Sequence, residues 1–243
     1  MRGAIAAWRL LRALLHLLHG MAVMASFPLR NPAGRHECIR WWSAGVLRAM
    51  GLEVQIHGTP RPGATLIVAN HVSWLDIVAI HAAAPHARFV SKADVLSWPL
   101  LGWLIRNAGT LFIERERKRD AVRVVHAVAA ALEQGDTVAV FPEGTTGGGP
   151  ELLPFHANLL QAAVATGTPV QPVLLRFFDA SAPFSQAVEY LGETTLMQSV
   201  WRVACARGLG VRVELMAPLA TPHADRRALA AHLRDVMAAR LGT

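Results

Sequence analysis

Cysteine and charged residues are both scarce in this sequence. Its 243 residues include only two cysteines, Cys38 and Cys205, which are too few and too far apart for a disulfide framework or a paired-cysteine metal site. Charged residues make up 17% of the chain, below the roughly 25% that is usual, while 53% of the residues are hydrophobic. This composition excludes a disordered chain and indicates apolar surface in contact with something other than water. The two cysteines fit a reducing compartment.

Motifs that define several common functions are also absent. The net charge of +7 favours an anionic partner, but the chain has no recognition-helix, zinc-finger or RNP-type signature, so a lipid surface is a better partner than nucleic acid. The glycine-rich run at residues 144–149 lacks the Lys-Ser/Thr pair of a nucleotide-binding loop. The eleven histidines show no His-Glu-x-x-His spacing, so we expect no metal site. No Gly-x-Ser-x-Gly elbow is present, which argues against a covalent serine intermediate.

The first 29 residues are strongly apolar but are interrupted by basic side chains. At 100° per residue, these fall within an arc of roughly 100° and predict a basic stripe on an apolar helix; they are Arg2, Arg9, Arg12, His16 and His19. Within this segment the longest run without Lys, Arg, Asp or Glu is 13–29, which is borderline for a membrane span. We expect first an interfacial helix with the stripe toward anionic headgroups, then a true span, then an ordinary packing helix. The basic residues also interrupt the apolar core that a cleaved signal peptide needs.

A second helix is predicted from about residue 36 to residue 50, after a turn at residues 31–34. Its Trp41 and Trp42 fit either a lipid interface or burial between the two helices. We therefore predict that residues 1–50 form a two-helix membrane-associating hairpin and that residues 51–243 form a separate domain.

From Gly51 onward, short β-branched or alternating segments are separated by helical ones. This alternation predicts an α/β fold with a mostly parallel central sheet flanked by helices. The expected strands are 52–56, 64–69, 88–92, 110–113, 137–141, 170–176 and 211–215, and the expected helices are 77–84, 98–106, 118–132 and one that starts at Thr221.

The segment Asn70–Asp76 follows the strand at 64–69 and precedes a helix, so His71 is expected on the loop at the carboxyl end of that strand. With Ser73 as the helix N-cap, Asp76 lies in the first turn and reaches back to the imidazole. An aspartate placed there fixes the tautomer of the imidazole and stabilises the imidazolium, which suits a general base. The alternative is that Ser73 and Asp76 form only a capping arrangement, in which the carboxylate binds backbone N–H groups.

Three further blocks follow in order: residues 109–115, residues 141–146 and residues 170–173. Together with Asn70–Asp76 they resemble the four-block pattern of the glycerolipid acyltransferases, whose best-known members are the 1-acylglycerol-3-phosphate acyltransferases. The resemblance covers about residues 64 to 176. It implies that His71 deprotonates the acceptor hydroxyl, which attacks the acyl thioester directly, with Asp76 as its orienting carboxylate.

The resemblance also implies the substrate-binding residues. In the family the arginine that closes the second block binds the acceptor phosphate, and this role falls on Arg115, while the basic residues at 117–119 are interpreted as a solvated charge run. The third block belongs to the acceptor site and supplies Glu143, Gly144 and Thr145, and Asn70 completes the substrate-binding set. Two departures from the common pattern remove positive charge near the acceptor: this chain has Thr146 in place of an arginine and His156 in place of a lysine.

The expected function is therefore O-acyl transfer from acyl-CoA or acyl-carrier protein to lysophosphatidic acid in phospholipid biosynthesis, without a cofactor. The protein is expected on the cytoplasmic face of the inner membrane, with a lysophospholipid, the donor and anionic lipids as partners and no nucleic acid. The missing charges at Thr146 and His156 keep open another acceptor such as lyso-ornithine lipid. A non-catalytic lipid-binding protein on the same fold is the contrasting alternative.

Overall fold

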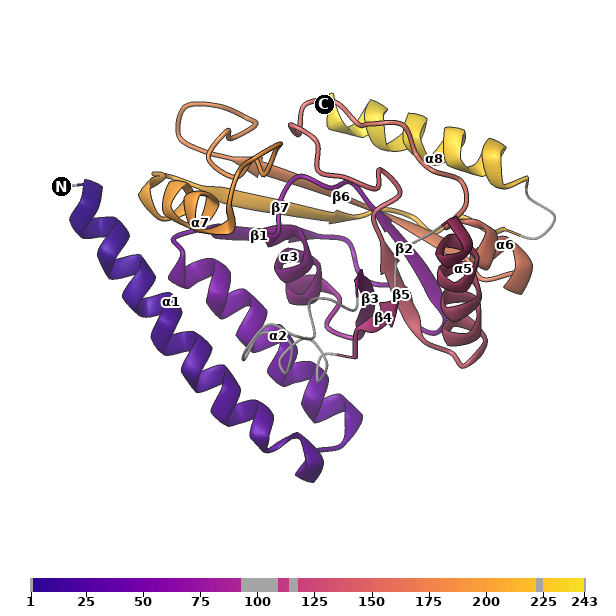
Figure 1. Cartoon of the computed structure of the whole chain (residues 1–243), viewed down its shortest axis with the longest axis horizontal. Helices are drawn as coiled ribbons and strands as arrows, with labels where there is room; N and C mark the ends of the chain where they lie inside the picture. The colour runs from indigo at the N-terminus through magenta and orange to yellow at the C-terminus, as the bar shows by residue number, and fades with distance from the viewer. Residues whose placement is uncertain (1, 93–108, 114–117, 222–224, 243) are drawn as a thin grey trace.

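The computed structural model describes residues 2–92, 109–113, 118–221 and 225–242. These residues form a seven-stranded sheet between two layers of helices (Figure 1). The helices are α1 (Arg2–Ala25), the 3-10 helix η1 (Phe27–Leu29), α2 (Pro32–Ala49), α3 (Leu75–Ala83), α5 (Lys118–Glu133), α6 (Gln161–Thr166), α7 (Leu196–Cys205) and α8 (Arg226–Leu241). The strands are β1 (Glu53–His57), β2 (Thr65–Ala69), β3 (Ala87–Lys92), β4 (Leu111–Ile113), β5 (Thr137–Val140), β6 (Val170–Phe178) and β7 (Gly210–Leu215).

The strand order is β1-β7-β6-β2-β5-β3-β4, and every neighbouring pair is parallel except β6 and β7. The predicted α/β class with a mostly parallel sheet is confirmed. Because β2, β3, β4, β5 and β6 share one direction, the loops that leave their carboxyl ends meet at one edge of the sheet. His71 follows β2 and Phe141 follows β5 at this edge.

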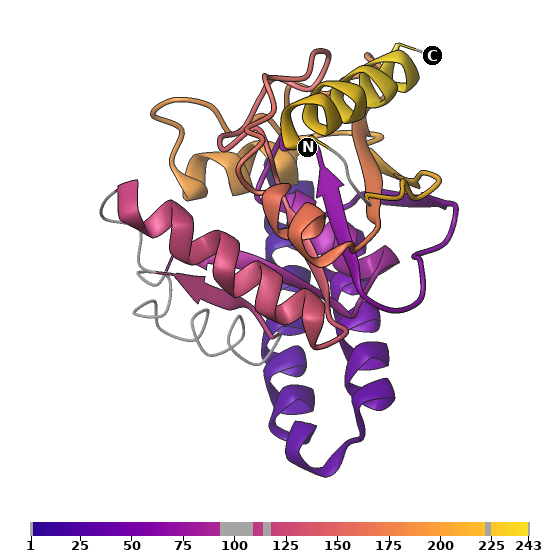
Figure 2. The same ribbon diagram turned by 90° about the vertical axis from the view of Figure 1, so that its right-hand side faces the viewer.

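Strand β2 lies at the centre of the sheet, and all five of its residues are buried. Ile67 and Ala69 pack into the core on one face with residues of α2, α3 and α7, whereas Leu66 and Val68 pack on the other face with residues of α5, α6 and α8. Figure 2 shows α5, α6 and α8 together on the side of the sheet away from the α1–α2 hairpin. The two apolar faces hold the strand rigid, and with it the loop that carries His71.

The second helix begins earlier than predicted. Asn31 is the N-cap of α2, and its side-chain oxygen accepts a hydrogen bond of 2.8 Å from the Gly34 N–H. Pro32 occupies the first helical position, where its missing N–H costs nothing. Residues 31–34 are therefore the cap and first turn of the helix and not a separate turn. α2 then packs on α1 and on α3, so the hairpin is joined to the sheet through α3.

Part of the basic stripe on α1 contacts the protein, whereas Arg12 and His19 are exposed, so the orientation of the stripe toward lipid headgroups stays a prediction. Arg9 donates to the carbonyl oxygens of Ala204 and Ala206 at the end of α7, and His16 Nε2 lies 2.9 Å from the Trp42 carbonyl oxygen. The His19 ring packs edge-on against Trp41. The carbonyls at a helix end need hydrogen-bond donors, and Arg9 supplies them for α7. Arg9 and His16 thus hold α1 against α7 and α2.

The face of α1 beside this stripe is apolar and exposed, with side chains spaced every three or four residues along the helix. Trp8 is 59% exposed and Leu15 57% exposed; the other exposed large apolar side chains of α1 are Ile5, Leu11, Leu14 and Leu18. No helix in the described part of the chain has the length and hydropathy required to cross a membrane.

Further differences concern the helices α6, α7 and α8. α8 begins at Arg226 with Asp225 as its N-cap, four residues or more after the predicted start. α6 and α7 were not predicted, because six and ten residues carry too short a periodic pattern. The helix predicted at 98–106 lies outside the described residues.

Candidate active site

His71 and Asp76 meet directly. The His71 Nδ1 lies 2.7 Å from the Asp76 Oδ2, although five residues separate them in the chain. Because an ionised carboxylate only accepts hydrogen bonds, the proton of the neutral imidazole resides on Nδ1. The Nε2 lone pair is therefore available to accept a proton from a substrate hydroxyl. The His71 side chain is 22% exposed, whereas that of Asp76 is completely buried.

The same carboxylate oxygen also organises the loop. Asp76 Oδ2 accepts hydrogen bonds from the backbone N–H groups of Val72 at 2.7 Å and Ser73 at 2.9 Å. The catalytic and the capping interpretations of Asp76 therefore describe one arrangement. The predicted cap residue is wrong: α3 begins at Leu75 with Trp74 as N-cap, and the buried Ser73 hydroxyl has no hydrogen-bond partner among the described residues. Asp76, and not the Ser73 hydroxyl, accepts the hydrogen bonds of the backbone N–H groups in this loop.

Burial raises the pKa of Asp76, and its hydrogen bond with His71 opposes that rise. The ionised carboxylate therefore depends on its three donors for stability. The two residues are therefore coupled. An imidazolium at His71 stabilises the Asp76 carboxylate, and the carboxylate stabilises the imidazolium.

Glu143 fixes the backbone of the His71 loop from the neighbouring strand. Its Oε1 accepts a hydrogen bond of 2.8 Å from the His71 N–H, and its Oε2 accepts one of 3.0 Å from the Leu153 N–H. The Gly147 N–H in turn donates to the His71 carbonyl oxygen at 2.7 Å. Burial raises the pKa of Glu143. Both carboxylate oxygens of Glu143 thus accept hydrogen bonds from backbone N–H groups. The expected contact of Glu143 with substrate remains a prediction.

Asn70 joins the end of β2 to the middle of β6. Its Oδ1 accepts from the Leu175 N–H at 2.7 Å, and its Nδ2 donates to the Leu175 carbonyl oxygen at 2.9 Å. The side chain is buried in this reciprocal pair. The structure therefore gives Asn70 a positioning role, and its predicted role in substrate binding gains no support.

The third block forms an open loop beside His71. Gly144 has a positive φ of 72°, and a Cβ at this position would lie 3.2 Å from the His156 Cδ2. The imidazole of His156 therefore lies close to the backbone of Gly144. Thr145 is exposed on this loop, whereas the Thr146 hydroxyl donates to the Tyr190 carbonyl oxygen.

Arg115 lies outside the described residues, so its role stays a prediction. β4 ends at Ile113, at the same edge of the sheet as the His71 loop.

Two contacts of the site were not predicted. The Phe141 ring stacks on His71 with a centroid distance of 4.1 Å and an interplanar angle of 13°. The Trp74 Nε1 donates to the Ser199 hydroxyl of α7 at 3.1 Å, which ties the start of α3 to that helix. The sequence does predict that the block beginning at Phe141 lies beside the His71 loop, because it ends the strand at 137–141, but it does not predict the ring stacking. No local signal relates Trp74 to Ser199, which lies 125 residues away.

A partly exposed imidazole oriented by a buried carboxylate at the carboxyl edge of a parallel sheet is a candidate general-base site. The acyltransferase family model matches residues 53–176, which include this whole site. The chain belongs to this family and is an acyltransferase.

The chain is 37% identical over 216 residues to the lyso-ornithine lipid O-acyltransferase of Pseudomonas aeruginosa, covering 87% of this chain and 83% of the relative. It is 38% identical over 187 residues to the 1-acyl-sn-glycerol-3-phosphate acyltransferase of Neisseria meningitidis, covering 76% of this chain and 72% of the relative. The fold is similar to the crystal structure of the 1-acyl-sn-glycerophosphate acyltransferase PlsC from Thermotoga maritima. That match has a TM-score of 0.74 and 21% identity, and it covers 100% of this chain and 97% of the other.

Proposed function

We propose that this enzyme transfers a fatty acyl group from acyl-CoA or acyl-carrier protein to the free hydroxyl of lysophosphatidic acid and produces phosphatidic acid. His71 Nε2 takes the hydroxyl proton as the oxygen attacks the thioester carbonyl. The tetrahedral intermediate then collapses, the carbon–sulfur bond breaks, and the imidazolium returns the proton to the leaving thiolate. The observation that supports this mechanism is the 2.7 Å contact between His71 Nδ1 and Asp76, which leaves Nε2 as the base.

A second acceptor, lyso-ornithine lipid, is favoured by the loop next to His71. The Thr146 hydroxyl is engaged by a backbone carbonyl, and the acid Glu189 lies close by, with its Oε1 3.9 Å from a Cβ placed at Gly148. His156 supplies an imidazole in place of the lysine of the family pattern. These residues offer less fixed positive charge than an arginine and a lysine would. A zwitterionic ornithine headgroup needs less positive charge than a phosphate dianion does.

A competition assay separates the two acceptors. Purified enzyme receives one acyl-CoA and equal amounts of lysophosphatidic acid and lyso-ornithine lipid in mixed micelles, and the products are quantified by mass spectrometry. Lysophosphatidic acid is expected to have the higher kcat/KM. The Thr146→Arg variant should raise that ratio further, because a guanidinium binds phosphate bidentately, whereas Thr145→Arg on the exposed neighbour serves as the positional control. A higher kcat/KM for lyso-ornithine lipid would reassign the acceptor, and no transfer to either lipid would refute both proposals.

We also propose that the exposed apolar face of α1 binds the membrane on its cytoplasmic side, close to the soluble donors. α7 lies beside α1 (Figure 1) and exposes two further large apolar side chains, Met197 and Trp201. Its Ser199 contacts Trp74 at the start of α3. Both helices can thus insert apolar side chains into the interface while α7 holds the catalytic loop near the bilayer.

Vesicle sedimentation tests this orientation. Burying one leucine-sized side chain contributes about 1.5–3 kcal/mol, so Trp8→Ser with Leu15→Ser should weaken binding to neutral and anionic vesicles alike by at least tenfold. Arg12→Gln, on the same exposed face, should lose only about 1 kcal/mol and only on anionic vesicles. Arg9→Gln should leave vesicle binding unchanged but lower the thermal stability, because α7 loses its donors. Unchanged binding in the Trp8 and Leu15 double variant would refute the proposed face.

A further inference from the structure

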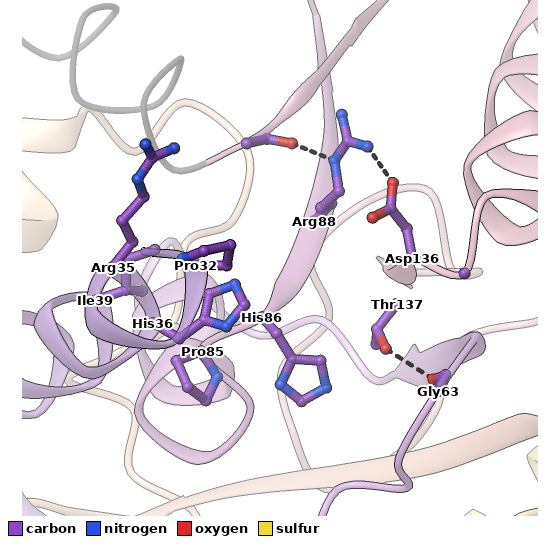
Figure 3. A pocket seen from close by; sticks show the side chains of 12 residues that line it. Pro32, Arg35, His36, Ile39, Gly63, Pro85, His86, Arg88, Asp136 and Thr137 are labelled. Carbon is purple, nitrogen blue, oxygen red and sulfur yellow. Dashed lines mark hydrogen bonds and ion pairs between the residues drawn. The ribbon is translucent and has the colours of Figure 1, made fainter. Parts of the chain in front are cut away.

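A cavity of about 500 Å³ opens at the edge of the sheet opposite His71 (Figure 3). It lies where β3 and β5 begin, beside the start of α2, and Thr137 at the start of β5 lines it. Phe141, which stacks on His71, follows the other end of that strand. Four strand residues span about 13 Å, so the cavity is separate from the catalytic centre.

Nitrogen-bearing side chains from three elements converge on this cavity. His36 comes from α2, His86 from the loop before β3 and Arg88 from β3, and the two imidazole centroids lie 6.1 Å apart. Arg88 Nε donates to the Gly109 carbonyl oxygen at 2.7 Å, and its Nη1 forms an ion pair with Asp136. These two bonds use two of the five guanidinium N–H donors and hold the group in place.

The electrostatic balance around the cavity is positive. Arg35 and Arg88 line the cavity, and Arg40 acts on both imidazoles from α2. The carboxylates that oppose them are Asp136, paired with Arg88, and Glu37, paired with Arg40. Among the residues that the structure describes, these three guanidinium groups and two carboxylates leave one net positive charge before either imidazole is protonated.

The surroundings of both imidazoles favour the neutral form by lowering the pKa of His36 and of His86. Burial lowers the pKa of His36 and of His86; Arg40 lowers both further, Glu37 raises that of His36, and His36 lowers that of His86. An anion placed between the rings would offset the repulsion between Arg40 and the protonated rings. Both rings could then donate hydrogen bonds to the anion. A divalent cation would meet the opposite situation, because the guanidinium groups repel it.

We propose that this cavity is a binding site for a phosphate monoester, held by His36, His86 and Arg88. Its volume is larger than a bare tetrahedral oxyanion needs and lies within the range of small-molecule sites, so it admits a phosphate with a glycerol-sized group attached. The phosphate has two sources, a soluble phosphorylated metabolite or the headgroup of an anionic phospholipid. The bound group would join α2 of the hairpin to β3 of the sheet through hydrogen bonds.

Sulfate is the first probe, because it remains a dianion between about pH 6 and pH 8, the range in which histidine titrates. Full-length protein in detergent is titrated with sodium sulfate by calorimetry at constant ionic strength. The wild type should bind one sulfate, several-fold more tightly at about pH 6 than at about pH 8. The His36→Gln/His86→Gln variant should bind at least about tenfold more weakly and lose this pH dependence. His126→Gln/His232→Gln, which replaces two exposed histidines on α5 and α8, is the matched control and should behave like the wild type.

A measurement on the wild type keeps the test valid if the double variant fails to fold. Histidine ring NMR should show that sulfate raises the pKa values of His36 and His86 and of no other described histidine. Sulfate binding that is equal in the double and control variants, or sulfate that shifts neither ring, would overturn the proposal.

Two further titrations distinguish the sources. If the ligand is soluble, glycerol 3-phosphate should bind at least about tenfold more tightly than sulfate, and vesicle binding should not depend on the two histidines. If it is a lipid headgroup, adding phosphatidic acid to phosphatidylcholine vesicles should strengthen binding of the control variant but not of the His36→Gln/His86→Gln variant. The absence of both effects would overturn the phosphate monoester assignment. All these readouts measure binding and are independent of acyltransferase activity.

Discussion

Asp76 Oδ2 both accepts the backbone hydrogen bonds of the loop and places a negative charge beside His71. Replacing Asp76 with asparagine separates these two roles. Asparagine keeps a side-chain oxygen that can accept from Val72 and Ser73, so the loop retains its capping bonds. It removes the negative charge next to His71. At an effective dielectric constant of about 20, opposite charges about 4 Å apart attract by about 4 kcal/mol. Each 1.36 kcal/mol of lost transition-state stabilisation lowers the rate tenfold, so we expect kcat/KM to fall by about a thousandfold.

The free energy of unfolding should change much less. The amide nitrogen would take the place of Asp76 Oδ1, which is buried without a hydrogen-bond partner among the described residues. An unsatisfied buried N–H costs about 1–3 kcal/mol. Removing a buried carboxylate whose pKa is raised by burial offsets part of that cost. Asp76→Ala, in contrast, leaves both loop N–H groups without their acceptor and should cost about 2–4 kcal/mol.

The pH dependence of stability provides an independent check. The folded chain retains the Asp76 proton at pH values where the unfolded chain has released it, because burial raises the folded pKa. The contribution of Asp76 to the free energy of unfolding therefore rises as the pH falls through the raised pKa of the folded chain. It is complete below the pKa of the unfolded chain, and it is lost again as the pH rises through the folded pKa. The asparagine variant should show a flatter curve in this range.

The assay measures thiol release from acyl-CoA with a lysolipid acceptor, alongside thermal unfolding of the same preparations. Ser73→Ala is the control, because the buried Ser73 hydroxyl has no hydrogen-bond partner among the described residues and its removal should leave both readouts nearly unchanged. An Asp76→Asn enzyme with near-normal kcat/KM would show that Asp76 only caps the loop, and the general-base mechanism would have to be abandoned.

Three other predictions follow from the same site. His71→Ala should abolish acyl transfer and leave thermal stability and vesicle binding intact; measurable turnover near the wild-type rate would contradict the mechanism. Arg115→Ala should raise the acceptor KM far more than the donor KM, and Arg115→Lys should recover little because one ammonium cannot bind a phosphate bidentately; equal effects on both substrates would indicate a structural role. Glu143→Gln should lower the free energy of unfolding by about 1–3 kcal/mol and reduce kcat, because an amide cannot accept from both the His71 and Leu153 N–H groups; unchanged thermal stability would contradict this.

The strands and the contact between His71 and Asp76 could be predicted from the sequence because their signals are local. β2 is a run of apolar, β-branched residues that are buried on both faces, and the five-residue spacing of His71 and Asp76 fits a loop followed by a helix start. The alternation of strands and helices likewise predicted the mostly parallel sheet. These features depend on neighbours in the chain, which the sequence displays directly.

The functions of Asn70 and Glu143 within the loop could not be read in the same way. Asn70 pairs with Leu175, 105 residues away, and Glu143 binds the N–H of His71, 72 residues away. Both contacts connect adjacent parallel strands, and strand order is decided only when the whole sheet assembles. A buried polar side chain in a sequence has no visible partner until that assembly is known.

The orientation of α1 likewise depends on both the local sequence and the contacts of the folded chain. Its sequence determined a helix with an apolar face and a basic stripe, but both faces were able to meet either the membrane or the protein. The end of α7 decided part of the outcome: its carbonyl groups accept from Arg9, which turns inward, while Trp8, Leu15 and Arg12 stay exposed. The sequence alone thus determined the local elements and the pairing of His71 with Asp76. Tertiary structure decided which surfaces remain for membrane and ligands, because unsatisfied backbone groups select their partners only in the folded chain.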